Sequence, residues 1–565
     1  MNINSYIKLL PFQFRKQVMK IILIGILNRL LDLVGLASLL PIIIVIINPS
    51  SIIGSDSFMS RLFQTIGLES LAQFGIIFGV IALVLLPLKS IITIWLGNIQ
   101  NKFYLEIYKY YSRKLYNHYH EKGLLFIRQT YSSQLAFHIN GACYGFATSV
   151  IKTILDSISN LAIMLLLVGF LVWIAPMASI TLLVAMLPVS LIYLLVVRNK
   201  LKKLGSDAYE ARRRQAQIVQ ESLKGHVSLN INDSFENISK DFEKGLDTIS
   251  KADIKNIIYK HIPSVLFQVC TVIALIILLL EGSINNTPIN SFIVFGFIAI
   301  RIMPSLLTII SNWHTLQNNR YIIDVIRGID VDIEEKNSEL PQPINLNQQI
   351  ELRNISFAFE TDNPMFSNFS LKIHKGEAIG FRGNSGTGKS TLFNLLLGFY
   401  IPQQGGVYID GVKLSSQNRK NWHKQVGYVE QDIFIKNDSL AKNIAMSTDE
   451  PDYNRILKIF DQVGLKDWFT TLSNGFETIL GEGGTTVSGG ERQRIGIARA
   501  LYKNPKVLFI DEATSALDTK REEDILSLLS SLASENFTLL IISHRERTLR
   551  FCNRIIDIEP SLYTQ

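Results

Sequence analysis

A glycine-rich segment in the second half of the chain has the composition of a phosphate-binding loop. Residues 383–390 read Gly-Asn-Ser-Gly-Thr-Gly-Lys-Ser and fit the pattern G-x-x-x-x-G-K-[ST]. An apolar run precedes them and a helix-forming run follows, which argues against a chance glycine-rich turn. Glycines let backbone N–H groups face phosphates, the lysine neutralises phosphate charge, and the serine hydroxyl can ligate Mg²⁺. The predicted nucleotide-binding residues here are Gly383, Asn384, Ser385, Gly386, Thr387, Gly388, Lys389, Ser390 and Thr391.

A second apolar run, Val507–Ile510, ends in the two carboxylates Asp511 and Glu512. Acidic pairs at strand ends are common, so this pair gains meaning only from the phosphate-binding loop upstream. In that combination we expect Asp511 to hold a metal ion. We expect Glu512 to polarise the attacking water and accept its proton. The two motifs together predict ATP hydrolysis supported by Mg²⁺, with Ser390 as a further metal ligand.

A third motif makes a family resemblance visible. Residues 488–493, Ser-Gly-Gly-Glu-Arg-Gln, resemble the signature motif of ABC ATPases, and residues 350–556 are similar to that family throughout. The resemblance implies that Ser488, Gly489, Gly490 and Glu491 contact a nucleotide. It also implies that Gln431 contacts the metal and that residues 515–518 form the D-loop. His544 would be the switch histidine, acting with Lys389 and Glu512 in catalysis, and Phe359 would stack on the adenine.

Phe359 stands where the family usually has a tyrosine, so a core aromatic of the first strand remains an alternative interpretation. In this family two ATPase domains close head to tail, and each ATP lies between the phosphate-binding loop of one and the signature motif of the other. One chain carries one complete set of motifs, which implies a homodimer. A heterodimeric partner is not excluded.

The first half of the chain is unusually apolar. Hydrophobic residues make up 48% of the 565 residues, and the long apolar runs lie before residue 312. A helix needs about 20 apolar residues to cross a bilayer. Six runs approach this length, and we predict transmembrane helices at about 21–47, 74–96, 158–174, 177–197, 265–280 and 289–310. The predicted fold is therefore an all-α membrane domain over 1–328 with long cytoplasmic extensions, a linker over 329–349, and an α/β P-loop ABC ATPase domain over 350–565.

Charge distribution predicts the orientation of these helices. The net charge is +8, and the cations cluster in the two long loops after the second and fourth runs. That placement fits anionic lipid better than nucleic acid, and it puts both termini in the cytoplasm of a multi-pass inner-membrane protein. Residues Pro11–Lys16 combine aromatic and cationic side chains, and we expect a short interfacial helix there. The three scattered cysteines show no metal-ligand spacing.

The membrane half resembles six-span exporters, and residues 300–305 and 309–314 resemble the sixth span of lipid-linked oligosaccharide flippases of the PglK type. Lys89 stands where that family carries an arginine. Pro263 and Ser264, where the family pattern would place another cation, carry no charge. We predict that Arg301 and Lys89 hold a substrate phosphate, since charges at bilayer depth must face protein or water. The alternatives are that Lys89 snorkels or pairs with an acid, and that Arg29 and Asp32 form a structural pair.

These observations predict an ATP-driven exporter or flippase. The lead substrate is a lipid-linked oligosaccharide or a similar phosphate-bearing glycolipid, moved out of the cytoplasm or the inner leaflet. Export of peptides or hydrophobic drugs is the main alternative, because one fold serves many substrates. A regulator or ATP-gated channel without transport is a remote alternative, since such proteins often lose catalytic residues and this chain keeps Glu512, Ser488 and His544.

Overall fold

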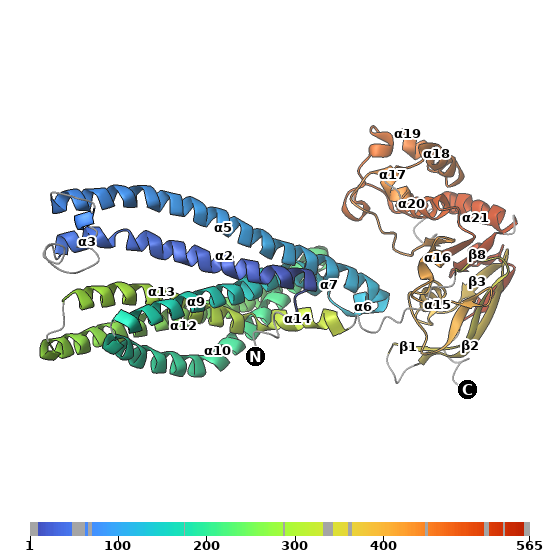
Figure 1. Ribbon diagram of the computed structural model, residues 1–565. Helices are drawn as coiled ribbons and strands as arrows, with labels where there is room; N and C mark the ends of the chain where they lie inside the picture. The colour runs from blue at the N-terminus through green and yellow to red at the C-terminus, as the bar shows by residue number, and fades with distance from the viewer. Residues whose placement is uncertain are drawn as a thin grey trace. The chain divides into compact units, whose positions relative to one another are not determined.

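The structure is a computed structural model of the whole chain. It describes residues 9–47, 61, 63–65, 70–174, 176–285, 289–331, 343–359, 364–446, 450–512, 519–534 and 537–558. The chain divides into two compact units (Figure 1). The first comprises Met1–Lys122 and Phe126–Lys336, and the second comprises Gly123–Leu125 and Asn337–Gln565.

The first unit is helical, and its long helices lie side by side (Figure 1). Its apolar stretches all fall on helices, several of which continue far beyond the apolar run into charged sequence. The helices of this part of the chain are α2 (Phe12–Ala37), α3 (Leu40–Ile47), α5 (Leu71–Glu121), α6 (Gly123–Gln129), α7 (Ser132–Phe137), α8 (Cys143–Gly145), α9 (Lys152–Ile174), α10 (Pro176–Lys224), α11 (His226–Ile231), α12 (Phe235–Asn285), α13 (Ile289–Asn318) and α14 (Arg320–Val331). Two π-helical segments, η2 (His138–Ala142) and η3 (Phe146–Ile151), flank α8.

Three helical stretches of the described residues are long and apolar enough to cross a membrane: Leu71–Glu121, Ser132–Phe170 and Phe235–Ile277. The predicted total of six spans remains a prediction. Residues Phe12–Lys16 form the first turns of the continuous helix α2, so the separate interfacial helix expected there is wrong. The chain does not break after Lys16 because helix-forming residues without Gly or Pro continue the pattern to Ile24.

The second unit is α/β and contains two sheets. An antiparallel sheet has the order β2-β1-β4-β5, and a parallel sheet has the order β6-β7-β8-β3-β9. The strands are β1 (Gln349–Ala358), β2 (Pro364–His374), β3 (Ala378–Arg382), β4 (Gln404–Ile409), β5 (Val412–Lys413), β6 (Val426–Val429), β7 (Val507–Asp511), β8 (Thr538–Ile542) and β9 (Arg554–Asp557). The helices are α15 (Lys389–Leu396), α16 (Arg419–His423), α17 (Leu440–Ile444), α18 (Tyr453–Gln462), α19 (Lys466–Thr470), α20 (Gly489–Tyr502), α21 (Thr519–Ser534) and α22 (Glu546–Leu549), with 3₁₀ turns η4 (Gly475–Glu477) and η5 (Glu482–Gly484).

The central strands of the parallel sheet are buried on both faces, which explains why they are continuous apolar runs instead of alternating ones, whereas the edge strand β9 is largely exposed. Every residue of β7 and of β8 is buried. One core lies between the two sheets around α15 and includes Phe381, Phe393 and Phe509. The other core includes residues of α17, α18, α20 and α21. The sheet therefore provides a rigid platform, and the segments that leave its strands are fixed at their first residue.

Candidate nucleotide site

Four of the predicted motifs leave the same edge of the parallel sheet. Parallel strands place their carboxyl ends together, and in open α/β sheets ligands bind beyond those ends. The phosphate-binding loop follows β3, Gln431 follows β6, Asp511 and Glu512 end β7, and His544 follows β8. Residues separated by up to 161 positions in the sequence are thereby brought to one place. Strand order alone accounts for this convergence.

Glycine is required in the phosphate-binding loop for a specific steric reason. Gly386 and Gly388 have φ angles of 85° and 97°, a region that favours glycine. A Cβ atom on Gly388 would lie 2.9 Å from Cγ and Sδ of Met365, whereas one on Gly386 would meet no atom within 4 Å. The loop then enters α15, whose first N–H groups form an anion-binding helix terminus.

Lys389 is buried at the base of this loop, with 6% of its surface exposed. Its Nζ donates to the carbonyl oxygens of Gly383 and Asn384, each at 2.7 Å. Burial lowers the pKa of the ammonium, and the carboxylates of Glu512 and Asp511 oppose that shift. An ammonium has three donors, so two hold the loop and a third can meet a phosphate oxygen.

Glu512 has an unusual backbone conformation. Six described residues other than glycine have a positive φ, and five of them are Asp or Asn, which tolerate it; Glu512, at 53°, is the sixth. Its N–H donates to the carbonyl of Ile542, which holds the turn. Strained backbone of this kind collects at functional sites, where it directs a side chain.

The Glu512 carboxylate contacts both of the other predicted polar residues of the site. Nε2 of Gln431 donates to Oε2 at 3.0 Å, and Nε2 of His544 lies 2.9 Å from Oε1. The structure thus joins β6, β7 and β8 through three side chains. Family resemblance named these residues separately, and it did not foresee that a single carboxylate links them.

Groups suited to Mg²⁺ are oxygen donors near the phosphate loop. Asp511 is 4% exposed at the end of β7, and Ser390 is exposed on the first turn of α15. Among the described residues no group of three or more His, Cys, Asp or Glu side chains forms a protein cage for a metal. The donor set of one carboxylate, one hydroxyl and the Gln431 amide fits Mg²⁺, which usually binds through one or two carboxylates plus substrate phosphates.

The predicted signature motif starts a helix. Ser488 is the N-cap of α20, its N–H donates to Glu491 at 2.7 Å, and the two residues form a capping box. Gly489 is exposed. No hydrogen bond or ion pair among the described residues joins residues 488–491 to the phosphate loop. One copy of the chain therefore assembles the hydrolytic groups without the signature motif.

Two further predicted positions differ in how completely the structure describes them. Phe359 follows β1, is 41% exposed, and packs edge-on against Phe357 and Tyr400 at centroid distances of 5.1 and 5.7 Å. The Phe359 ring is therefore packed against two aromatic rings and partly exposed to solvent. Residues 513–518, which include the predicted D-loop, lie outside the described residues.

The two predicted substrate residues lie in the helical unit. Lys89 of α5 forms an ion pair with Asp32 of α2, with Nζ 2.6 Å from Oδ1. Arg29 is farther from the same carboxylate, at 4.0 Å. The structure therefore agrees with the alternative interpretation, in which Lys89 pairs with an acid. Arg301 lies on α13, and its side chain is outside the described residues.

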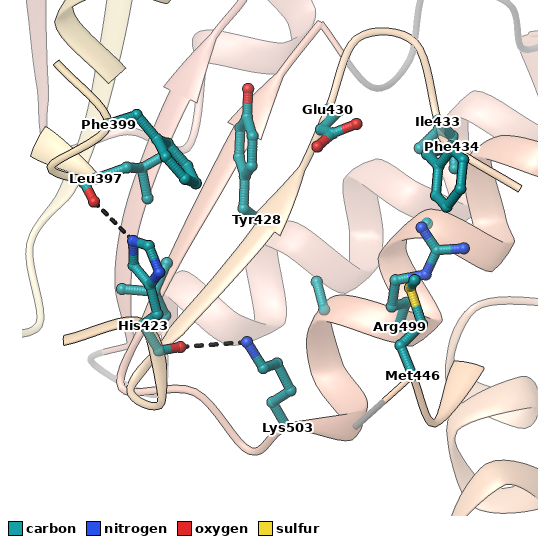
Figure 2. Close-up of a pocket in the computed structure, with 13 residues that line it drawn as sticks. Leu397, Phe399, His423, Tyr428, Glu430, Ile433, Phe434, Met446, Arg499 and Lys503 are labelled. Carbon is teal, nitrogen blue, oxygen red and sulfur yellow. Dashed lines mark hydrogen bonds between the residues drawn. The ribbon is translucent and has the colours of Figure 1, made fainter. Parts of the chain in front are cut away.

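A pocket that the sequence did not reveal lies beside Gln431 (Figure 2). It has a volume of about 270 Å³. Figure 2 shows Phe399, Tyr428, Phe434 and Met446 on its walls, together with His423, Glu430, Arg499 and Lys503. His423 donates to the carbonyl of Leu397, and burial lowers the pKa of its imidazole. Gly496 and Arg499 of α20 and Lys503, the C-cap of that helix, line the pocket. Their spacing of three and four residues is the sequence signal that places them on one helix face.

Comparisons with known proteins show the family to which the chain belongs. A family model described as ABC transporter matches residues 366–515. An ATP-dependent lipid A-core flippase from Thiobacillus denitrificans is 30% identical over 442 residues, which cover 76% of this chain and 74% of the flippase. This chain belongs to the ABC transporters. The transporter combines an ATP-hydrolysing domain with a helical membrane domain, as a half-transporter does.

Other relatives resemble the transporter over shorter regions. The leukotoxin export ATP-binding protein LtxB of Aggregatibacter actinomycetemcomitans is 36% identical over 50% of this chain. The alpha-hemolysin translocation ATP-binding protein HlyB of Escherichia coli O157:H7 is 35% identical over 51% of it. The transporter spans only 40% of the length of each. The structure of a bacterial Atm1-family ABC exporter with ATP bound matches with a TM-score of 0.78, 20% identity, and coverage of 96% and 95% of the two chains, which shows a shared fold.

Proposed function

We propose that the transporter is an ATP-driven flippase for a phosphate-bearing glycolipid. The observation that supports hydrolysis best is the Glu512 carboxylate, held by Gln431 and His544 next to the buried Lys389. A regulator that does not hydrolyse ATP would not need a carboxylate on strained backbone with a hydrogen-bond partner for each oxygen. Glu512 accepts the proton of the attacking water, and His544 orients the carboxylate.

The roles of the loop residues follow from their contacts. Residues 383–391 direct N–H groups and the α15 terminus at the phosphates of the substrate ATP, and Lys389 neutralises them. Phe359 offers its exposed ring to adenine. Ser390, Gln431 and Asp511 would hold Mg²⁺, which supplies charge neutralisation at the phosphates when bound.

We also propose that two copies form the complete site. Ser488, Gly489, Gly490 and Glu491 present a capped helix terminus that no described contact joins to the phosphate loop of its own chain. A second copy, related by a two-fold axis, would bring its α20 terminus over the phosphates, and the arrangement would be reciprocal. A homodimer accounts for both sites with one set of motifs.

The pocket beside Gln431 is a candidate docking site for a helix of a second copy. We propose that α11 of the second copy occupies it. Leu223, Val227, Ile231 and Phe235 form an apolar stripe at or near α11, each 54–78% exposed, and the pocket has apolar walls of matching character. A disulfide between V227C and M446C, in a background without the native cysteines, should yield a covalent dimer on a denaturing gel. Cross-linking within single chains only would contradict this arrangement.

The substrate assignment depends on similarity to the lipid A-core flippase over three quarters of both chains, and on cations in the apolar helices. Lipid A-core and lipid-linked oligosaccharides both join phosphate to a sugar and to an apolar anchor. Asp32 neutralises Lys89, so Arg301 is the stronger of the two proposed phosphate ligands; a guanidinium pairs with phosphate bidentately. We place the transporter in the inner membrane with both termini in the cytoplasm.

The test uses the full chain in proteoliposomes. Flipping of a pyrophosphate-linked glycolipid and of lipid A is measured beside export of an uncharged amphipathic drug, with and without ATP. Arg301→Leu should reduce glycolipid flipping strongly and Arg301→Lys partly, while ATP hydrolysis without substrate stays near the wild-type rate. Undiminished glycolipid flipping by Arg301→Leu would overturn the phosphate role. Transport of the drug alone would favour the drug exporter instead.

A further inference from the structure

We propose that an ion pair between Arg382 and Asp557 positions the phosphate-binding loop for ATP. Arg382 is the last residue of β3 and stands directly before Gly383, the first residue of the loop. Asp557 is the last residue of the neighbouring strand β9. Nε of Arg382 donates to Oδ1 of Asp557 at 2.7 Å, and Nη2 donates to Oδ2 at 3.0 Å. Neither residue belongs to the motifs recognised in the sequence.

The geometry of this ion pair distinguishes it from most exposed ones. The two side chains are 49% and 48% exposed, and exposed pairs contribute little where long side chains are mobile. Here two parallel hydrogen bonds fix the guanidinium against the carboxylate. The hydrogen bonds from Arg382 also lower the pKa of the Asp557 carboxyl, so the pair is charged at neutral pH. The pair therefore holds the ends of β3 and β9 together.

A series of contacts connects the ion pair with the lysine of the loop. The N–H of Ile558, the residue after Asp557, donates to the carbonyl of Arg382 at 2.7 Å. A Cβ atom on Gly383 would lie 2.4 Å from the carbonyl oxygen of Ile558, so the chain leaving β9 packs directly against the loop backbone. The carbonyl of Gly383 accepts from Nζ of Lys389 at 2.7 Å. A shift of the β9 end would therefore move a carbonyl that holds the buried lysine.

Ion pairs join the edge strand β9 to β3 at both ends. The strand has four residues, three of them exposed, and it lies beside β3 at the edge of the parallel sheet. At its start, Nε of Arg554 is 3.2 Å from Oε1 of Glu377, the residue directly before β3. Of the two pairs, the one at Asp557 lies next to the phosphate-binding loop. The pair at Arg554 therefore provides a control on the same two strands.

The test measures kcat and KM for ATP in steady-state hydrolysis by the purified full chain. A loop that is in its binding conformation for less of the time has a lower apparent affinity for ATP. Arg382→Gln and Asp557→Asn should each raise KM about 2–5-fold, with kcat near the wild-type value. A purely electrostatic effect on the anionic nucleotide would have opposite signs in the two variants, since Asp557→Asn removes a negative charge. A KM at or below the wild-type value for Asp557→Asn would overturn the proposal.

The matched control is Arg554→Gln, which removes the ion pair at the other end of β9. It should leave KM unchanged, and an equal rise would assign the effect to a general loss of strand stability and overturn the positioning role. The rescue exchanges the two charges. Arg382→Asp and Asp557→Arg should each raise KM alone, because like charges then face each other, and the two together should bring KM back toward the wild-type value. An exchanged variant no better than the single ones would also overturn the proposal.

The inference rests on the proposed role of the loop in ATP binding, and it does not depend on which substrate the transporter moves. Lys389→Ala, assayed beside these variants, separates the two proposals. If Lys389→Ala leaves ATP binding unchanged, both fail. If Lys389→Ala weakens ATP binding and Asp557→Asn does not raise KM, the positioning role of the ion pair fails by itself.

Discussion

Glu512 shows how backbone geometry and side-chain chemistry combine at a single residue. Its left-handed φ turns the carboxylate away from the path of β7, and the N–H bond to Ile542 stabilises that turn. Gln431 and His544 then hold one oxygen each. A carboxylate with two neutral or cationic donors keeps its position while it awaits a water molecule, which a free side chain on a loop would not do.

Replacing Glu512 with Gln should separate hydrolysis from binding. Glutamine keeps the size of the side chain but cannot accept the proton, so we expect ATP turnover to fall about 10²–10⁴-fold. Nucleotide affinity should stay near the wild-type value. The checks are steady-state ATPase activity and binding of a fluorescent ATP analogue by the full chain. Glu523→Gln, on the exposed surface of α21, is the matched control and should leave both unchanged. Near wild-type turnover by Glu512→Gln would mean that another group is the base.

Lys389→Ala should instead weaken the binding of ATP, and hydrolysis should fall with it. The buried ammonium holds two loop carbonyls and is proposed to meet the phosphates, so its loss should weaken ATP binding itself by about 10–100-fold. The same fluorescent analogue measures this. Binding unchanged from wild type would contradict the proposed contact.

At the residue scale, the sequence predicted what depends on local pattern. Gly388, Lys389, Asp511 and Glu512 were identifiable because the motif, the strand and the helix follow each other in the chain. The contacts of Glu512 with Gln431 and His544 were not, because they depend on the order of strands in the sheet. Lys89 was identified as a charge in an apolar run, but its partner lies 57 positions away on another helix.

At the scale of helices, close packing depends on single small residues. On α10, a Cβ atom at Gly205 would lie 2.2 Å from the carbonyl oxygen of Asn318 at the end of α13. Backbone cannot yield as a flexible side chain can. The glycine therefore sets how closely these two helices approach. Its role is invisible in the sequence, where Gly205 is one of 35 glycines.

Gly205→Ala should therefore destabilise the transporter. Overpacking typically costs about 1–3 kcal/mol, and it outweighs the gain of about 0.5–1 kcal/mol that alanine brings to a helix interior. Gly97→Ala on α5 is the matched control, since a Cβ there meets no atom within 4 Å. It should be neutral or stabilising. Thermal unfolding of the purified full chain in detergent measures both, and a higher melting temperature for Gly205→Ala would show that the helices separate without cost.

A histidine joins three helical segments in the part of the helical unit outside the apolar runs. His138 of η2 is buried; its Nδ1 lies 2.8 Å from the Tyr119 hydroxyl and its Nε2 2.9 Å from the Tyr209 hydroxyl. Burial lowers the pKa of the imidazole, and the Arg213 guanidinium lowers it further. The folded protein thus favours the neutral ring, which links α5, η2 and α10.

This arrangement predicts a pH dependence of stability. Because the folded pKa lies below the unfolded value of about 6.5, the unfolded chain binds more protons just below that pH. The contribution of His138 is complete above pH 6.5 and is lost as the pH falls through the folded pKa. His138→Gln should unfold at a lower temperature at pH 7.5 and lose less on acidification to pH 5.5. His120→Gln, an exposed position on α5, should follow the wild-type curve; a wild-type slope for His138→Gln would remove the histidine as the cause.

Proline positions show which features of a helix the sequence does and does not determine. A proline in a helix interior removes one backbone hydrogen bond and can end or kink the helix. Pro41 lies in the first turn of α3, just after α2 ends, where a missing N–H is tolerated. Pro87, Pro188 and Pro304 instead lie inside single helices. Tertiary packing decides between a break and continuation, which a local residue preference cannot reveal.

At the scale of the whole molecule, the described residues of one chain show no bond between the phosphate loop and the signature motif. The hydrolytic groups converge at the edge of the parallel sheet, while the α20 terminus has no described bond to the phosphate loop. Sequence motifs named both halves of the proposed site, and family resemblance implied that they come from different copies. Sequence length and motif pattern do not show how two copies of a chain pack, so the proposal that each site is shared between two copies calls for a direct test.

Mixing two inactive variants provides that test. Lys389→Ala disables the phosphate loop. Gly489→Asp places a carboxylate where the phosphate would bind and still suits the first turn of α20. If each site is composite, a dimer of one copy of each variant has one site with both defects and one with neither. With random assortment about half of the dimers are mixed. Co-expression should then restore about a quarter of wild-type ATPase activity, provided that the two sites act independently.

The control places both substitutions on one chain and mixes it with wild type. A mixed dimer then has one defect in each site, so activity should come from wild-type dimers alone, again about a quarter of the total. The two mixtures differ if each site lies within one chain. In that case the separate variants would restore nothing, and the doubly substituted chain mixed with wild type would retain about half. Restored activity in the first mixture, together with a quarter in the second, requires that each ATP contact two copies of the chain.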